Sequence, residues 1–198
     1  MNIVFDIGNV LLRWDPRFLY RRIFADENRM EWFLTHVCSN DWNLEQDRGR
    51  SFAEAVREAT LRHPDYAAEI AAYDERWQET LPHAIDGSVA ILESLAARGA
   101  ALYAITNWNG EKFRETRGRF GFLGRFRDIV VSGDEWLVKP DPAIYRLLLD
   151  RNGLAAADCL FIDDSAANVA GAEAVGMSAH HFHSPELLAE ALRRTGRL

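Results

Sequence analysis

The sequence predicts an α/β protein whose parallel sheet is covered by helices on both faces. From Val89 onward, short apolar runs alternate with longer amphipathic ones, which is typical of parallel strands joined by crossover helices. The longer runs also carry residues that commonly start and stop helices. A short apolar run at the beginning of the chain, Ile3 to Phe5, supplies one more strand.

The expected strands are short and are bounded by turn or polar residues. In chain order they are IVFD (3–6), ALYAIT (101–106), RDIVVS (127–132), CLFID (159–163) and SAHHF (178–182). Because a helix-like stretch lies between one strand and the next after Val89, neighbouring strands are expected to run parallel.

The helices between these strands have recognisable ends. They are predicted over residues 90–99, 141–153 and 165–176. Gly99 stops the first of them, and the second has Asp141 as its N-cap, Pro142 as its first residue and Gly153 beyond its end. These signals support the alternation of strand and helix.

One segment departs from this alternation. Between Trp14 and about Leu81 there is no convincing strand, only helix-period stretches: PRFLYRRIF, MEWFLTHV, SFAEAVREAT and YAAEIAAYDERWQ. No internal repeat or flexible Gly/Ser linker is visible, so this insertion is expected to pack against the core. The sequence therefore predicts a helical domain of residues 14–81, inserted into a core domain of residues 1–13 and 82–198.

Composition argues against several classes of protein. With 198 residues, of which 48% are hydrophobic and 27% charged, the chain is typical of a soluble globular protein. A formal charge of −7 without a dense Lys/Arg tract argues against nucleic acid as a partner, and no uncharged run approaches the length that spans a membrane. The two cysteines, Cys38 and Cys159, suggest neither a disulfide framework nor a zinc site. The reducing cytoplasm is the simplest compartment.

Polar and charged residues lie where the expected strands end or a following helix begins. In chain order they are Asp6, Thr106, Asn107, Lys139, Asp163 and Asp164. Since ligands of open parallel sheets bind outside the carboxyl ends of the strands, these side chains are expected to meet. Three acids would repel one another there unless a positive charge lies among them. Asp163 and Asp164 could also merely cap the helix that starts near Ser165.

A divalent cation is the economical way to hold three carboxylates together. Ligands that are all oxygen suit a hard ion such as Mg²⁺ better than zinc or copper, and Mg²⁺ in turn points to phosphate. The hydroxyl of Thr106, the amide of Asn107 and the ammonium group of Lys139 could hold the oxygens of a phosphoryl group. Asp6 would then be free to act as a nucleophile.

These motifs resemble those of the haloacid dehalogenase superfamily of hydrolases. FDIGNV resembles the first family motif, ITN (105–107) the second, VKPDPAIY (138–145) the third and FIDDSAANVAGA (161–172) the fourth. The resemblance covers essentially the whole chain and implies a Rossmann-like core with a helical cap over the active site, at the place of the insertion. The DxGNV start and the phrase LEQDRGRSFAEA are most similar to the bacterial alpha-D-glucose-1-phosphate phosphatase-like subgroup.

The resemblance implies a Mg²⁺-dependent phosphatase acting on a small phosphorylated metabolite. Asp6 would attack phosphorus to form an aspartyl-phosphate, which water then hydrolyses. The residues implied to hold Mg²⁺ are Asp6, the backbone carbonyl of Gly8, and Asp164, with Asp163 in or beside its shell and Asn168 in support. Those implied to bind the phosphoryl oxygens are Thr106, Asn107 and Lys139. Trp108 directly follows Asn107 and is expected to line the substrate pocket.

Position 8 departs from the usual phosphatase pattern. A second Asp, acting as general acid and base, normally stands two residues after the nucleophile, and this chain has Gly8. A backbone carbonyl can still bind the metal, but the proton donor is lost. A good leaving group, such as an anomeric sugar oxygen, needs less protonation, which favours sugar 1-phosphates or a slower enzyme. Asp15, Asn9 or a solvent network could supply the proton instead.

Two other functions are compatible with these motifs. In a 2-haloacid dehalogenase the same aspartate attacks carbon without a metal, but two further carboxylates beside the nucleophile would be a hindrance to that reaction. Gly8 lacks the acid that usually stands at this position, which would be compatible with a binding protein that has no catalytic activity. The presence of Asp6 and Lys139 argues against that alternative.

Overall fold

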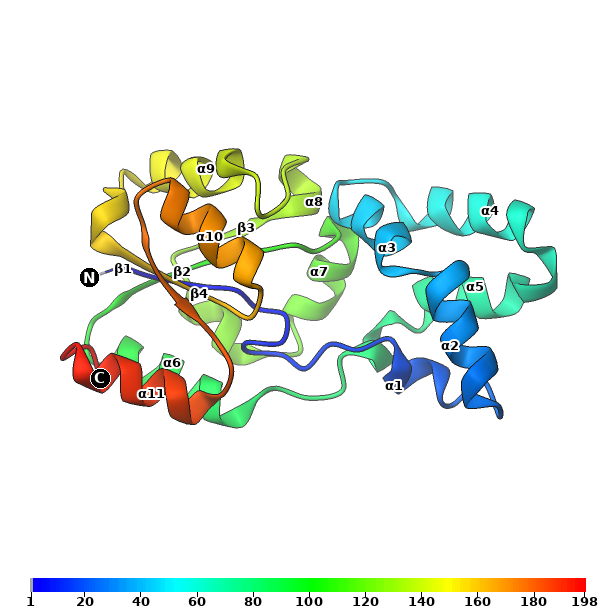
Figure 1. Ribbon diagram of the computed structural model, residues 1–198, viewed down its shortest axis with the longest axis horizontal. Helices are drawn as coiled ribbons and strands as arrows, with labels where there is room; N and C mark the ends of the chain where they lie inside the picture. Colours follow the sequence, from blue (N-terminus) through cyan, green and yellow to red (C-terminus); the bar gives the residue numbers. More distant parts are fainter. Residues whose placement is uncertain (1) are drawn as a thin grey trace.

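A single sheet forms the centre of the molecule in a computed structural model that describes residues 2–198 (Figure 1). It has five parallel strands in the order β3-β2-β1-β4-β5. The strands are β1 (Asn2–Phe5), β2 (Ala101–Thr106), β3 (Asp128–Val131), β4 (Cys159–Asp163) and β5 (Ser178–His181). The predicted α/β class and parallel sheet are confirmed.

Helices cover both faces of the sheet (Figure 1). α6 (Asp86–Ala97) and α11 (Pro185–Arg194) lie on one face, and α9 (Pro142–Asn152) and α10 (Ala166–Ala174) lie on the other. Alternate side chains of a strand point to opposite faces, so Ile3 and Phe5 join one apolar cluster and Val4 joins the other. All three are fully buried.

The predicted helix ends agree with the structure at α9 and less well at α6. In α9, the Asp141 side chain accepts a hydrogen bond from the Ala143 backbone N–H, and Gly153 ends the helix with a φ of 62°. α6 begins at Asp86, four residues before the predicted start at residue 90. Its first turn is Asp86, Gly87 and Ser88, which lack the apolar spacing that predicted the rest of the helix.

Strand ends also differ from prediction by one residue. β1 ends at Phe5, because Asp6 already begins the loop, although the Asp6 backbone N–H still donates to Ile162 O at 2.8 Å. Ser132, predicted as the end of the third strand, instead begins the short helix α8 (Ser132–Glu135). Asp6, Asn107 and Asp164 therefore lie directly beyond their strands, whereas Thr106 and Asp163 are the last residues of β2 and β4.

The insertion is helical throughout the segment in which strands were not expected. Its helices are α1 (Arg17–Tyr20), α2 (Glu27–His36), α3 (Asn40–Asp47), α4 (Phe52–Arg62) and α5 (Ala67–Glu75). Figure 1 shows them together at one end of the molecule, beyond α7 (Gly110–Arg117) and α8. Their aromatic interior, which includes Phe33, Phe52 and Tyr73, belongs to the same apolar cluster as the α6 and α11 face of the sheet.

The two connections between insertion and core run side by side. The Arg13 backbone N–H donates to His83 O, and the Asp15 N–H donates to Thr80 O, both at 3.1 Å. We therefore propose the predicted division into a core of residues 1–13 and 82–198 and a cap of residues 14–81; Met1 lies outside the described residues. Among residues 2–198, no helix combines the length and apolar character needed to cross a membrane.

Candidate active site

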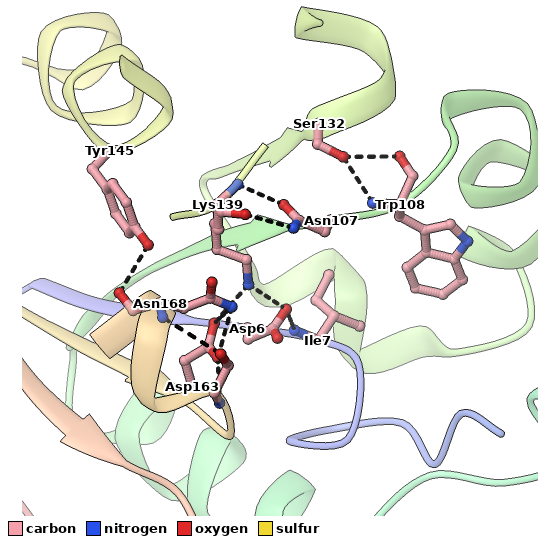
Figure 2. A network of polar contacts seen from close by, with 10 residues as sticks. Asp6, Ile7, Asn107, Trp108, Ser132, Lys139, Tyr145, Asp163 and Asn168 are labelled. Atoms are coloured by element: carbon pink, nitrogen blue, oxygen red, sulfur yellow. Dashed lines mark hydrogen bonds and ion pairs between the residues drawn. The ribbon is translucent and has the colours of Figure 1, made fainter. Parts of the chain in front are cut away.

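The predicted site residues meet at the carboxyl ends of β1, β2 and β4 (Figure 2). Phe5, the last residue of β1, is paired with Ala104 of β2 and Ile162 of β4. This register places Asp6, which follows β1, beside Asp163, which ends β4. Carboxylate oxygens of Asp6, Asp163 and Asp164 lie within 4.8 Å of one another.

Lys139 lies between two of these carboxylates. Its Nζ is 2.9 Å from Asp6 Oδ1 and 2.7 Å from Asp163 Oδ2. All three side chains are buried, with Asp163 fully inaccessible to solvent. One ammonium group balances only one of three negative charges when all the acids are ionised. Since buried charge is costly unless it is compensated, the site is suited to receive a further cation.

Burial and neighbouring charges shift the pKa values of these groups. Burial raises the pKa of Asp6 to about 7; the charge of Lys139 opposes this rise, and Asp163 and Asp164 add to it. Burial and the charge of Asp163 also raise the pKa of Asp164. Burial alone would lower the pKa of Lys139, but the attraction of Asp6 and Asp163 outweighs it and raises the pKa. Lys139 is therefore held as a cation.

Asp163 has its oxygens occupied by donors from the protein. Oδ1 accepts from the Ser165 backbone N–H at 2.8 Å and from Asn168 Nδ2 at 3.0 Å. Oδ2 accepts from Asn168 Nδ2 at 3.1 Å and from Lys139 Nζ at 2.7 Å. The Tyr145 hydroxyl donates to Asn168 O at 2.8 Å and holds the start of α10 in place (Figure 2). Asp163 thus orients Lys139 and also contributes to the start of α10.

Asn107 fixes the loop that carries Lys139. Its Nδ2 donates to Lys139 O at 3.0 Å, and its Oδ1 accepts from the Lys139 backbone N–H at 2.8 Å. A carboxamide that both donates to and accepts from one residue sets the position of that residue closely. One amide N–H of Asn107 remains available, while the neighbouring Thr106 is buried at the end of β2 and borders the cavity described next.

A cavity of about 80 Å³ separates these strand ends from the insertion. The residues that line it are Gly8, Trp14, Asn43, Asp47, Trp77, Leu81, Thr106, Asn107 and Trp108. Trp108 lines this cavity, and its contact with substrate stays a prediction. Four buried polar atoms of these residues have no hydrogen-bond partner within the described residues 2–198: Asn43 Oδ1 and the indole Nε1 atoms of Trp14, Trp77 and Trp108. Unpartnered buried donors and acceptors are costly, so this wall is suited to contact a polar ligand.

Sequence reasoning missed the residues that the insertion contributes to this wall: Trp14, Asn43, Asp47 and Trp77. Asn43 and Asp47 lie on α3, within or beside the phrase LEQDRGRSFAEA that carried the subgroup resemblance. No periodicity separates them from the other polar residues of α3. Only their position in the folded chain reveals that they face the strand ends.

The donor set at the strand ends fits a hard divalent cation. Asp6 and Asp164 present carboxylate oxygens, and the backbone carbonyl of Gly8 follows two residues after Asp6. Among residues 2–198, the one group of His, Cys, Asp and Glu side chains that could hold a metal is Asp6, Asp163 and Asp164. Oxygen ligands of this kind are those that Mg²⁺ prefers.

A parallel α/β sheet with a helical insertion after its first strand, and with carboxylates and a buried lysine at its strand ends, places the protein among the hydrolases of the α/β class. Within that class, the chain belongs to the haloacid dehalogenase-like hydrolase family, whose family model matches residues 1–176. The recognition made from the four motifs is thus confirmed at the level of the family.

Relatives with known names are similar over most of the chain. A 5'-nucleotidase of Pseudomonas aeruginosa is 34% identical over 188 residues, which cover 89% of this chain and 80% of that protein. A sesquiterpene phosphatase of Aspergillus oryzae is 28% identical over 181 residues, covering 90% and 88%. The fold is similar to that of a family enzyme of Bacteroides thetaiotaomicron, with a TM-score of 0.75 and 23% identity over 97% of this chain and 98% of that one. That enzyme has also been solved with magnesium and inorganic phosphate.

Proposed function

We propose that this protein is a Mg²⁺-dependent phosphatase that hydrolyses a small phosphomonoester through an aspartyl-phosphate on Asp6. The observation that carries the proposal is the buried contact of Lys139 with Asp6 and Asp163, which leaves a surplus of carboxylate charge at the strand ends. A phosphoryl group with its cation complements this arrangement in charge. The phosphatase and nucleotidase names of the relatives support the same class of reaction.

Each residue then has a part in phosphoryl transfer. Asp6 Oδ2, which is not paired with Lys139, attacks phosphorus, while Lys139 and the Thr106 hydroxyl contact the phosphoryl oxygens. The free amide N–H of Asn107 contributes a further donor. Bound Mg²⁺ would neutralise charge on the phosphoryl oxygens. The residues that would hold it are Asp6, Gly8 through its carbonyl, and Asp164, with Asp163 beside them.

The leaving group is proposed to be polar and small, as in a sugar phosphate. The cavity encloses about 80 Å³, and three of the residues that line it, Trp14, Trp77 and Trp108, carry buried indole N–H groups with no hydrogen-bond partner among residues 2–198. Such donors complement hydroxyl or ether oxygens. The two relatives are named for a sesquiterpene and a nucleotide, which supports a leaving group that varies between relatives, and in this chain the cavity wall is proposed to choose it.

Hydrolysis of p-nitrophenyl phosphate tests the proposal directly. Phosphate release should require Mg²⁺, stop on addition of a chelator and be abolished by Asp6→Asn. Asp158→Asn is the matched control, because Asp158 is exposed and lies at the opposite end of β4. Chelator-insensitive halide release from a 2-haloacid would instead identify a dehalogenase. If neither reaction is observed, the remaining alternative is a binding protein without catalytic activity.

A further inference from the structure

The loop after β1 lacks a suitable proton donor for the leaving group. Gly8 has no side chain, and a Cβ at that position would meet no atom within 4 Å, so the space beside it is open. Asn9 Oδ1 accepts from the Trp14 backbone N–H at 3.1 Å. Asp15 Oδ1 accepts from the Arg17 N–H at 2.9 Å and also pairs with the Arg17 guanidinium group at 3.3 Å. Both alternatives are therefore engaged elsewhere.

Asp47 supplies a carboxyl group to the cavity from the opposite wall. It is the last residue of α3 and lines the same cavity as Gly8, Thr106 and Asn107. Asp15, by contrast, borders a different and larger cavity, of about 530 Å³, on the side of Asp164. Asp47 is the one acidic residue in the lining of the cavity that contains Gly8.

The end of α3 is fastened to the loops that follow β2 and β3. Asn109 Nδ2 donates to Gln46 O at 3.3 Å and to Arg50 O at 3.2 Å, and the Ser132 hydroxyl donates to Asp47 O at 2.6 Å. Ser132 also accepts from the Trp108 backbone N–H at 2.9 Å. The backbone of Asp47 is thus held through Ser132 to Trp108, which directly follows Thr106 and Asn107 in the chain. These contacts fix the end of α3 relative to the end of β2.

The surroundings of Asp47 suit a group that both gives and takes a proton. Burial raises its pKa to about 7, against the opposing effects of the Asn109 backbone and the charge of Lys139. Burial raises the pKa of Tyr73, and the negative charge of Asp47 contributes to this rise. Asp47 Oδ2 also accepts a long hydrogen bond from Asn43 Nδ2 at 3.3 Å. General acids and bases work best with a pKa near the working pH.

We propose that Asp47 of the cap replaces the missing acid of the first motif, acting as general acid and then as general base. This inference rests on the proposed function. As Asp6 Oδ2 bonds to phosphorus, the bond from phosphorus to the leaving oxygen breaks, and that oxygen takes the proton of the Asp47 carboxyl group. The Asp47 carboxylate then takes a proton from the attacking water. The water oxygen bonds to phosphorus as the bond between phosphorus and Asp6 breaks, which frees inorganic phosphate and returns Asp6 as a carboxylate and Asp47 as a protonated acid.

The first experiment compares two leaving groups in single-turnover reactions with Mg²⁺. An alkyl phosphate needs a proton on its departing oxygen, and p-nitrophenyl phosphate does not. Asp47→Asn should slow transfer from the alkyl phosphate by about 10²- to 10⁴-fold, the usual contribution of a general acid, and slow transfer from p-nitrophenyl phosphate by less than about tenfold. Asp41→Asn, the same change at an exposed position of α3, is the control. Equal losses with both substrates, or no loss, would overturn the proposal.

A second variant separates proton transfer from a structural role. Gly8→Asp in the Asp47→Asn background places a carboxyl group in the open space beside the nucleophile. It should restore turnover of the alkyl phosphate at least tenfold, whereas a variant damaged only in packing would not be restored. Asp47→Asn alone should also accumulate phosphorylated enzyme after acid quenching, because the second step has lost its base. If Gly8→Asp restores no turnover and Asp47→Asn accumulates no phosphorylated enzyme, the proposed role of Asp47 is overturned. Failure of the wild type to release phosphate from either substrate would instead refute the proposed function.

Discussion

Two parts of the site are built in different ways: the strand-end group of Asp6, Lys139 and Asp163, and the cap wall of the cavity, which includes Trp14, Asn43, Asp47 and Trp77. At the strand ends, Lys139 Nζ contacts Asp6 Oδ1 at 2.9 Å and Asp163 Oδ2 at 2.7 Å. In the cap wall, the indole nitrogens of Trp14 and Trp77 have no hydrogen-bond partner. The charged side chains of the strand-end group pair with one another through Lys139, so their geometry suits one type of reaction. The cap wall leaves polar groups for a ligand and is suited to choose the leaving group.

This difference follows from how each part is held. The strand-end residues are placed by the parallel ladder, in which Phe5 pairs with Ala104 and Ile162. The cap residues come from helices whose contacts are mainly aromatic, such as Phe52 against Tyr73 and Trp77. Substitutions of Asp6, Lys139 or Asp163 should therefore damage both stability and reaction, whereas substitutions of the indole side chains that line the cavity should mainly change substrate binding.

Lys139→Met should give the largest effect. It leaves Asp6 and Asp163 buried without their cation, and breaking one side of a buried ion pair costs about 3–5 kcal/mol. Urea unfolding without Mg²⁺ should show this loss, and phosphatase activity should disappear. Lys112→Met is the matched control, since Lys112 is also buried but pairs with the more exposed Asp74 and Glu115. It should cost less stability and keep its activity; retained turnover in Lys139→Met would refute the role of Lys139.

Removal of Mg²⁺ should give the next largest effect. An ion that binds only the folded state stabilises it by about 2.7 kcal/mol at a concentration 100 times its Kd. The wild type should therefore gain stability when Mg²⁺ replaces chelator in the absence of substrate, and Asp164→Asn should lose most of that gain. Asp158→Asn should keep the gain, because Asp158 lies at the amino end of β4. Equal gains in both variants would place the metal away from the strand ends.

Trp108→Phe should give the smallest effect, and it should fall on binding. The change removes one indole N–H from the cavity wall and keeps the aromatic contact with Phe113. A lost neutral hydrogen bond of about 0.5–1.5 kcal/mol corresponds to a rise in KM of roughly 2- to 12-fold with little change in kcat. Trp32→Phe, at an exposed position of α2, is the control. An unchanged KM would show that this N–H does not face the substrate.

Most of the strand-end site could be predicted from the sequence. Parallel sheets bring the carboxyl ends of their strands to one edge, so Asp6, Thr106 and Asp163 could be placed together once the strands were recognised. The pairing of Asn107 with the Lys139 backbone could not, because a motif does not specify which groups hydrogen-bond within it.

The cap wall could not be predicted for a physical reason. Asp47 is separated from Asp6 by the whole of α1, α2 and most of α3. The sequence of α3, NDWNLEQD, is polar on most of its surface, so periodicity does not select the residue that faces the strand ends. That choice depends on hydrogen bonds from Asn109, which precedes α7, and from Ser132, the first residue of α8, both distant from α3 in sequence.

The most direct test of the account is to trap the covalent intermediate. Enzyme mixed with p-nitrophenyl phosphate and Mg²⁺, quenched in acid within one turnover and digested, should carry one phosphoryl group on the peptide that contains Asp6, and this group should be absent from Asp6→Asn. Phosphate release at the normal rate from enzyme that never carries a phosphoryl group on Asp6 would contradict the account.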